Sequence, residues 1–326
     1  MSLTPAPTDQ PAPAPPVHPK PLGEFAHEPL PRLPGPPRRA LFVRATLVGL
    51  VSGLTAVGFR VALEETENLR DLVLDLIGRT DWGLAAAIGL GAALVGAGVA
   101  LVRGVAPEAA GSGIPHLEGV LHNGFPFHWV RVFWVKVVGG ILSIGGGLAL
   151  GREGPTVQVG AAVGRAGGLW FSSNPEEERT LIAVGVVAGL SAAFNAPLAG
   201  MMFFFEELRG GDRPDDYLAA LLASAAGDLL AREILGQGPV FGAIPVDAPP
   251  PLEVVPLAIG IGVAGGIAGV LFNFTLFRTL GLFARVRSTI GGWQLAAVVG
   301  ALIGFLGWFH PDLLGGGHRL IGAALA

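Results

Sequence analysis

Apolar residues dominate the chain from residue 41 onward, and the longest apolar runs lie toward its two ends. A helix needs roughly 20 apolar residues to cross the hydrocarbon core of a bilayer. The runs 41–63 and 84–103 reach about that length near the start, and 253–283 and 290–309 reach it near the end. The pattern predicts membrane-spanning helices in an all-α protein.

Six shorter apolar segments lie between these long runs, and glycine or proline interrupts many of them. Several are too short to cross a bilayer. Broken helices are tolerated at membrane depth only where protein surrounds them or where they line a cavity. The pattern therefore predicts a polytopic membrane protein with broken, tilted helices and a transport site among them. The six segments are 112–122, 130–147, 153–169, 178–190, 195–208 and 214–235.

A weak internal repeat relates the two ends of the chain. A long span with an arginine near its end, a second span and a glycine-rich break occur at 41–113 and again at 253–317. Repeats of this kind are common in secondary transporters. We therefore expect a first repeat over 38–236 and a second over 237–326, with the second one incomplete because the chain stops soon after the break at 315–317.

The first 37 residues differ from the rest, because prolines crowd them and no apolar run is long enough for a signal peptide. This composition predicts a disordered or extended tail. Arg38, Arg39 and Arg44 follow the tail, and positive residues before a first span favour the cytoplasmic side. We expect a multi-pass protein of the cell membrane with a cytoplasmic N-terminus, in the bacterial inner membrane.

Composition agrees with a membrane location, because only 14% of the 326 residues are charged and 51% are hydrophobic. A soluble domain carries about a quarter charged residues. The formal net charge of -4 gives no basic field for nucleic acid, and the lack of cysteine excludes disulfides and cysteine-held zinc. We expect no metal, no cofactor and no enzyme activity, since no catalytic set or phosphate-binding loop stands at a credible spacing. Three histidines lie close together in sequence, His116, His122 and His128. Their spacing of six gives them no shared helical face, which argues against a metal site there.

The sequence Gly111-Ser112-Gly113-Ile114-Pro115 is the first candidate for an anion site. Glycine lets the backbone approach a ligand, Ser112 can cap a helix, and Pro115 suits a first helical turn. A helix start presents free N–H groups and a partial positive charge, so it holds an anion weakly enough for the ion to leave again. The alternative is a simple helix cap between two helices.

The sequence Gly151-Arg152-Glu153-Gly154-Pro155 lies between two apolar runs and forms the second candidate. Ionisable residues at membrane depth are costly and usually functional. An ionised Glu153 at a helix start would occupy the place of an anion, whereas a protonated one would be neutral and could swing away. The alternative is a helix cap in which Glu153 pairs with Arg152.

The third candidate is Asn195-Ala196-Pro197 together with Glu206 and Glu207 at the far end of the apolar helix that follows. We expect Asn195 to cap this helix and Pro197 to stand in its first turn. Acidic groups are unfavourable at a helix C-terminus, which favours a functional role for the pair. The alternative is an exposed pair at the membrane interface. Three lesser candidates, each expected to have a structural partner, are Glu118, Lys136 and Arg165.

In this order the three motifs resemble the CLC family of chloride channels and proton-coupled chloride exchangers, and the resemblance covers about residues 40–320. It implies the CLC-type inverted repeat and chloride as the substrate. The resemblance further implies that Ser112 contacts the central anion, that Glu153 gates the path and carries protons, and that Glu207 receives protons from the cytoplasm. The chloride-binding positions that it implies are Ser112, Gly113, Ile114 and Gly154.

Two features of the family are missing from the chain. We find no Gly-x-Phe-x-Pro motif in the second half, and Tyr217, the one tyrosine, lies in the wrong region to close the anion site. We therefore expect a second repeat that is truncated, and weak chloride transport by this chain alone. The full-length form is expected to be a homodimer in the lipid bilayer.

The leading functional hypothesis is a chloride/proton antiporter, because an acid at Glu207 favours exchange within the family. Two alternatives stay open. One is a passive chloride channel on the same fold, and the other is a truncated membrane fragment that does not transport.

Overall fold

The computed structural model describes residues 38–78, 80–172, 174–208, 213–236 and 252–317, so the predicted proline-rich tail lies outside the described residues. Within this part of the chain every regular element is helical, as predicted. The ten α-helices are α1 Arg38–Ile77, α2 Asp81–Val105, α3 Ile114–Asn123, α4 Trp129–Gly145, α5 Glu153–Phe171, α6 Pro175–Phe194, α7 Pro197–Phe203, α8 Pro214–Leu235, α9 Val255–Ile290 and α10 Gly292–Phe309.

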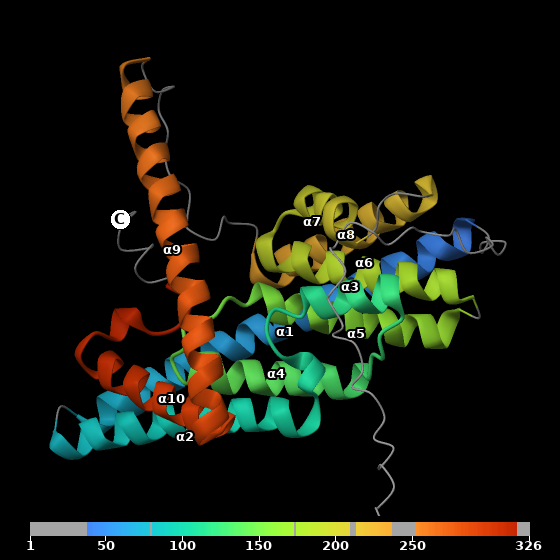
Figure 1. Ribbon diagram of the computed structural model, residues 1–326. Helices are drawn as coiled ribbons and strands as arrows, with labels where there is room; N and C mark the ends of the chain where they lie inside the picture. Colours follow the sequence, from blue (N-terminus) through green and yellow to red (C-terminus); the bar gives the residue numbers. More distant parts are fainter. Residues whose placement is uncertain (1–37, 79, 173, 209–212, 237–251, 318–326) are drawn as a thin grey trace, which may run out of the picture. The chain divides into compact units, whose positions relative to one another are not determined.

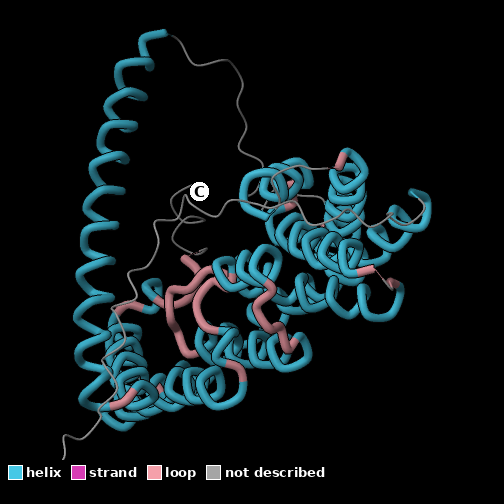
Figure 2. The backbone as a smooth tube through the Cα atoms, turned by 45° about the vertical axis from the view of Figure 1, so that its right-hand side comes forward, coloured by secondary structure: helices cyan, strands magenta, loops and turns pink. Residues whose placement is uncertain are grey.

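Among the described residues, four helices are long and apolar enough to cross a membrane, and they correspond to the four predicted long runs. They are the helices α1, α2, α9 and α10. The segments between α2 and α9 are the shorter helices that the glycine and proline pattern predicts. Figure 2 shows several of the connecting loops gathered in one region of the molecule.

The helix α1 is longer than the sequence predicts, because it continues through the acidic stretch after residue 63 as far as Ile77. This stretch was expected to be a link between two spans. No glycine or proline interrupts it before Gly78, and Arg60 forms an ion pair one turn ahead with Glu64, 2.8 Å between Nε and Oε1. Ion pairs at this spacing support a helix. The helix α1 therefore continues through these polar residues and carries their charged side chains on its surface.

The helices α5 and α6 are the most extensively buried helices of the core, and they pack against each other (Figure 1). Gly160 on α5 faces Gly185 on α6, and a side chain on either glycine would overlap the other's carbonyl oxygen. Gly164 meets Leu181 in the same way. Small residues let helices approach this closely where lipid removes the hydrophobic drive between them. The helices α1 and α8 pack on the same core.

The internal repeat is visible as a repeated order of elements. The helices α1 and α2 are followed by a 3₁₀ turn, η1 (Pro107–Ala109), and α9 and α10 by another, η4 (Pro311–Leu313). A glycine-rich segment follows each turn. The second helices of the two units, α2 and α10, pack against each other at Gly91 and Gly300, which are in backbone contact. In contrast, no residue of α9 is buried.

Candidate functional site

The first two motifs, forty residues apart in sequence, meet in the structure. A methyl group added to Gly154, the second residue of α5, would lie 3.0 Å from the Cα atom and 3.1 Å from the carbonyl oxygen of Ser112. Gly113 rests on the side chain of Gln158, one turn further along α5, so closely that a side chain on Gly113 would overlap it. The start of α3 is therefore seated on the start of α5.

The start of α3 differs in detail from the prediction. Gly113, and not Ser112, is the capping residue, because the backbone there is left-handed at φ 86°, which glycine adopts without strain. The hydroxyl of Ser112 accepts only a long hydrogen bond, 3.4 Å, from the N–H group of Ile114. Pro115 stands in the first turn as predicted. The Ser112 side chain is thus exposed beside a helix start whose first N–H groups have few partners.

Two polar side chains, from α4 and α5, form hydrogen bonds with the main chain of the loop before α3. Lys136 on α4 is only 5% exposed, and its amine donates to the carbonyl oxygens of Ala109 at 2.9 Å and Gly111 at 2.6 Å. Gln158 donates to the carbonyl oxygen of Glu108 at 2.9 Å. The partners of Lys136 are thus carbonyl groups, whereas Arg165 forms the ion pair expected of it, with Glu178.

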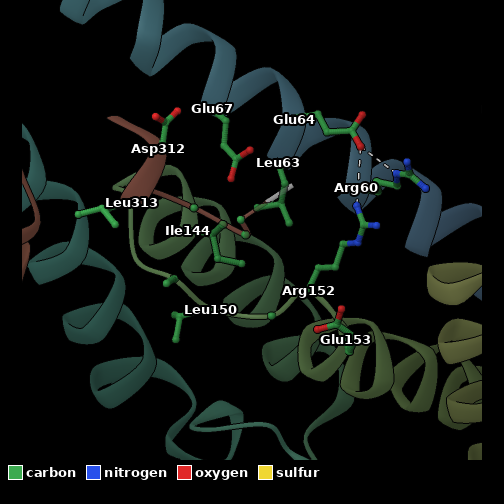
Figure 3. A pocket seen from close by; sticks show the side chains of 15 residues that line it. Arg60, Leu63, Glu64, Glu67, Ile144, Leu150, Arg152, Glu153, Asp312 and Leu313 are labelled. Carbon is green, nitrogen blue, oxygen red and sulfur yellow. Dashed lines mark hydrogen bonds and ion pairs between the residues drawn. The ribbon is translucent and has the colours of Figure 1, made fainter. Parts of the chain in front are cut away.

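Glu153 is the first residue of α5 and lines a cavity of about 340 Å³, which we call the Glu153 cavity. Figure 3 shows acids from two other elements facing this space, Glu64 and Glu67 on α1 and Asp312 on η4. The side chain of Arg152 extends toward Glu64, with 3.8 Å between Nη1 and Oε1, and away from Glu153. The structure therefore does not show the alternative pairing of Glu153 with Arg152.

A second cavity, of about 660 Å³, adjoins the first, and we call it the Ser112 cavity. Ser112 and Gly154 lie in its wall. The two cavities share Ile144, Leu150 and Gly151 in their walls, so they adjoin at the segment that leads into α5. Glu153 faces one cavity and its neighbour Gly154 faces the other.

The third motif lies apart from both cavities. Asn195 ends α6 as its C-cap, with a left-handed backbone at φ 53°, and does not cap α7 as predicted. Asparagine tolerates this conformation, which is why it stands at this turn. Glu206 and Glu207 are exposed on the π-helical turn η2 (Phe204–Leu208) that ends α7. Neither of them lines the Glu153 cavity or the Ser112 cavity.

Tyr217 on α8 belongs to the surroundings of this third motif. Its ring stacks on Phe205, with 4.1 Å between ring centroids, and packs edge-on against Phe204 at 5.9 Å. It lines neither cavity. This agrees with the sequence-based inference that Tyr217 does not close the anion site.

Comparison with known proteins explains this combination of motifs and fold. The model of the "Voltage gated chloride channel" family matches residues 91–326. The chain belongs to the CLC family. The helical architecture is the CLC fold, and the chain is a multi-pass membrane protein, as the sequence predicts.

Curated CLC relatives include the H(+)/Cl(-) exchange transporter ClcA of Citrobacter koseri, 39% identical over 297 residues, which cover 88% of this chain and 62% of the relative. The ClcA protein of Salmonella arizonae is 38% identical over 299 residues, with the same two coverages. The chain thus spans 62% of the length of these relatives.

Two solved CLC structures are similar to the chain. A slow cyanobacterial Cl-/H+ antiporter superposes with a TM-score of 0.78 at 33% identity, over 87% of this chain and 67% of that one. A CLC-type fluoride/proton antiporter superposes with a TM-score of 0.72 at 22% identity, over 88% and 70%, which shows a common fold.

Sequence reasoning missed the charges on α1 that face Glu153. Arg60, Glu64 and Glu67 were assigned to the end of a span and to a link. Their spacing was a usable signal, because residues 60, 64 and 67 recur at helical intervals and so share one face. It also missed Gln158, a lone amide buried among small residues, which needed a partner.

Proposed function

We propose that the chain forms the first part of the anion path of a chloride/proton antiporter. The observation that carries this proposal is the position of Glu153 and Gly154, adjacent residues that face two adjoining cavities. One turn of a helix start thus bears both a protonatable group and an anion-binding backbone. The relatives are named as exchange transporters, which favours exchange over passive conduction.

The proposed cycle uses this arrangement in two states of Glu153. When ionised, the carboxylate takes the anion's place at the start of α5, where backbone N–H groups and the helix dipole favour negative charge. When protonated, it is neutral and retreats into the Glu153 cavity, and chloride reaches the N–H groups near Ser112, Gly113, Ile114 and Gly154. In each turnover the carboxyl group of Glu153 therefore carries a proton and also opens the path for chloride. Glu207 is the proposed proton entry on the cytoplasmic side.

The proposal extends to orientation and assembly. The arginines in the first turns of α1 favour a cytoplasmic N-terminus and, in a bacterium, the inner membrane. The full-length protein is proposed to be a homodimer. Chloride is the proposed substrate because Ser112 resembles the serine that goes with chloride preference in the family, and both anion motifs stand intact.

Proton-coupled flux in liposomes tests the proposal. With chloride concentrated outside the liposomes, an antiporter is expected to move protons outward as chloride enters, whereas a passive channel would make the interior negative and draw protons inward. Because transport by this chain alone is expected to be weak, the outward proton movement is expected to be slow. Glu153→Gln is expected to abolish proton movement, because the amide cannot be ionised or carry a proton. Glu65→Gln, on an exposed position of α1 that faces neither cavity, is the control and should leave coupling intact.

Three results separate the readings. Chloride flux with no proton movement in the unmodified protein would support the passive channel. No flux of either ion would support the non-transporting fragment. Coupled flux that persists in Glu153→Gln would overturn the assigned role of Glu153.

A further inference from the structure

The wall of the Ser112 cavity is basic. Three cationic side chains lie in it, from Arg103 in the last turn of α2, Lys136 on α4 and Arg287 in the last turn of α9. Among the described residues, no aspartate or glutamate lines this cavity, whereas four acids and two arginines line the neighbouring Glu153 cavity. The two adjoining chambers therefore differ sharply in charge, and the basic one contains Ser112.

The three cations are not equivalent. The amine of Lys136 is buried and occupied by two carbonyl groups. Arg103 and Arg287 are exposed, and in the described part of the chain neither side chain has a carboxylate within ion-pair distance. The two guanidinium groups are thus the charges in this cavity that are available to a ligand. A guanidinium is always charged and presents several N–H donors to an anion.

The surroundings of Arg103 strengthen the positive field. Its guanidinium lies directly over Gly292, the first residue of α10, where any added side chain would overlap it. The start of an 18-residue helix carries a partial positive charge, so a cation placed there is unfavourable on its own. An anion shared between the guanidinium and the start of α10 would relieve this repulsion. Glycine at position 292 is what allows the close approach.

We propose that Arg103 and Arg287 form a collecting site for small inorganic anions, chloride in particular, from which the anion passes along the Ser112 cavity to Ser112. This inference rests on the proposed function. Charged clefts with low-dielectric walls concentrate ions of opposite sign and raise their rate of capture. Because both arginines are exposed, the site is weak and sensitive to ionic strength. Arginines at the ends of spans also favour the cytoplasmic side, so the site faces cytoplasmic chloride.

Chloride dependence of flux tests the collecting site. In Arg103→Gln and Arg287→Gln, the chloride concentration for half-maximal flux is expected to rise about threefold, and in the double variant about tenfold, the lower end of such focusing effects. Maximal flux and the ratio of protons to chloride should stay as in the unmodified protein, since Glu153 is untouched. Arg103→Lys keeps the charge and should recover most of the affinity.

Arg278→Gln is the matched control. Arg278 lies on the same helix as Arg287, and its substitution removes the same charge. Its guanidinium carbon lies 4.4 Å from the ring centroid of Phe274, and Arg278 does not line the cavity. The difference between the unmodified protein and the double variant should also shrink when an impermeant salt raises ionic strength. An unchanged chloride dependence in the double variant, or an equal change in Arg278→Gln, would overturn the proposal.

Chloride-35 linewidths measured on the purified protein separate this proposal from the proposed function. Exchange of chloride at the arginines is expected to broaden the line, and the double variant should reduce the broadening by at least half. If the unmodified protein carries no flux but the double variant loses this broadening, the transport proposal fails and the collecting site stands. If flux is normal and broadening is unchanged in the double variant, the collecting site fails alone. A matching size-exclusion profile confirms that the variants are folded.

Discussion

Gly154 determines how closely the two candidate anion motifs approach each other. A methyl group there would lie 3.0 Å from the Cα atom of Ser112, closer than carbon atoms normally pack, so Gly154→Ala must push the start of α3 away. We expect chloride flux to fall roughly tenfold, since a misplacement of about 1 Å can cost about a hundredfold in a preorganised site and the displacement here is smaller. Liposome flux measures the effect.

The control for this change is Gly89→Ala on α2, where an added methyl group meets nothing within 4 Å. Alanine also favours helix over glycine by about 1 kcal/mol, so this variant should be as active and at least as stable as the unmodified protein. Equal flux from the two variants would contradict the importance of the contact between Gly154 and Ser112.

Lys136 supports the next prediction at the residue scale. In Lys136→Met the carbonyl groups of Ala109 and Gly111 lose their donor, and each such hydrogen bond to a charged group contributes about 1.5–3 kcal/mol. We expect faster backbone hydrogen exchange over residues 106–113 and reduced chloride flux. Arg131→Met, an exposed position on the same helix, is the control. Unchanged exchange in this loop would refute the anchoring role.

At the residue scale, the sequence was informative about chemistry and less so about geometry. Ser112 and Glu153 could be singled out because a serine beside glycines and an acid within apolar runs need a reason to be there. Whether Ser112 or Gly113 caps α3 depends on a backbone angle that is fixed only when α3 packs on α5. Asn195 can cap either end of a helix, and the turn between α6 and α7 selects the C-terminal role.

Helix α6 is buried along almost its whole length, and its contact with α5 depends on residues without side chains. A methyl group on Gly185 would lie 3.0 Å from the amide nitrogen of Gly164 and would overlap the carbonyl oxygen of Gly160. We expect Gly185→Ala to destabilise the protein by about 1–3 kcal/mol, the usual cost of overpacking a core. Thermal unfolding in detergent measures the change.

The control lies on α9, where Gly262 has nothing within 4 Å of an added methyl group. Gly262→Ala should leave the unfolding temperature unchanged or raise it slightly. A similar loss of stability in both variants would mean that the α5–α6 contact is not the cause.

Element positions were predictable because glycine, proline and hydrophobic length mark helix ends in membrane proteins. The ten described α-helices fall on the ten predicted apolar segments. The extension of α1 to Ile77 was not predicted, because polar residues were interpreted as a link, although nothing in them breaks a helix. The consequence matters for the site, since this extension carries Glu64 and Glu67 to the Glu153 cavity.

At the scale of the whole molecule, the chain's lack of cysteine allows its orientation to be measured directly. Asp81→Cys marks the start of α2, and Gly104→Cys and Ser288→Cys mark the ends of α2 and α9. With a cytoplasmic N-terminus, a membrane-impermeant maleimide should label Asp81→Cys in intact cells. The other two should react only in inverted vesicles, because the arginines beside them favour the cytoplasmic side.

The unmodified protein should take up no label, which makes it the internal control. Labelling of Gly104→Cys and Ser288→Cys from opposite sides would contradict the arrangement in which Arg103 and Arg287 share one cavity. Labelling of Asp81→Cys from the same side as both would contradict a membrane-spanning α2.

The repeated order of two long helices and a glycine-rich segment could be predicted, but the cavities could not, and the bounds of the two repeats stay a prediction. The recurrence of two spans and a glycine-rich break is visible in the sequence, and α2 and α10 pack together at Gly91 and Gly300. The division of charge between the two cavities depends on which helix faces which, and that follows from contacts distant in sequence. Arg103 and Arg287 are separated by 184 positions, so no local pattern could have joined them.

Lys136 and Gln158 hold the loop before α3 by its main chain, because their hydrogen bonds go to backbone carbonyl oxygens of that loop. These hydrogen bonds do not depend on which side chains the loop carries. If Ser112 contacts the anion as proposed, replacing it with another small residue is expected to change ion preference without displacing this loop. Under the proposed function, a single substitution at position 112 is therefore expected to alter anion specificity while the fold is kept.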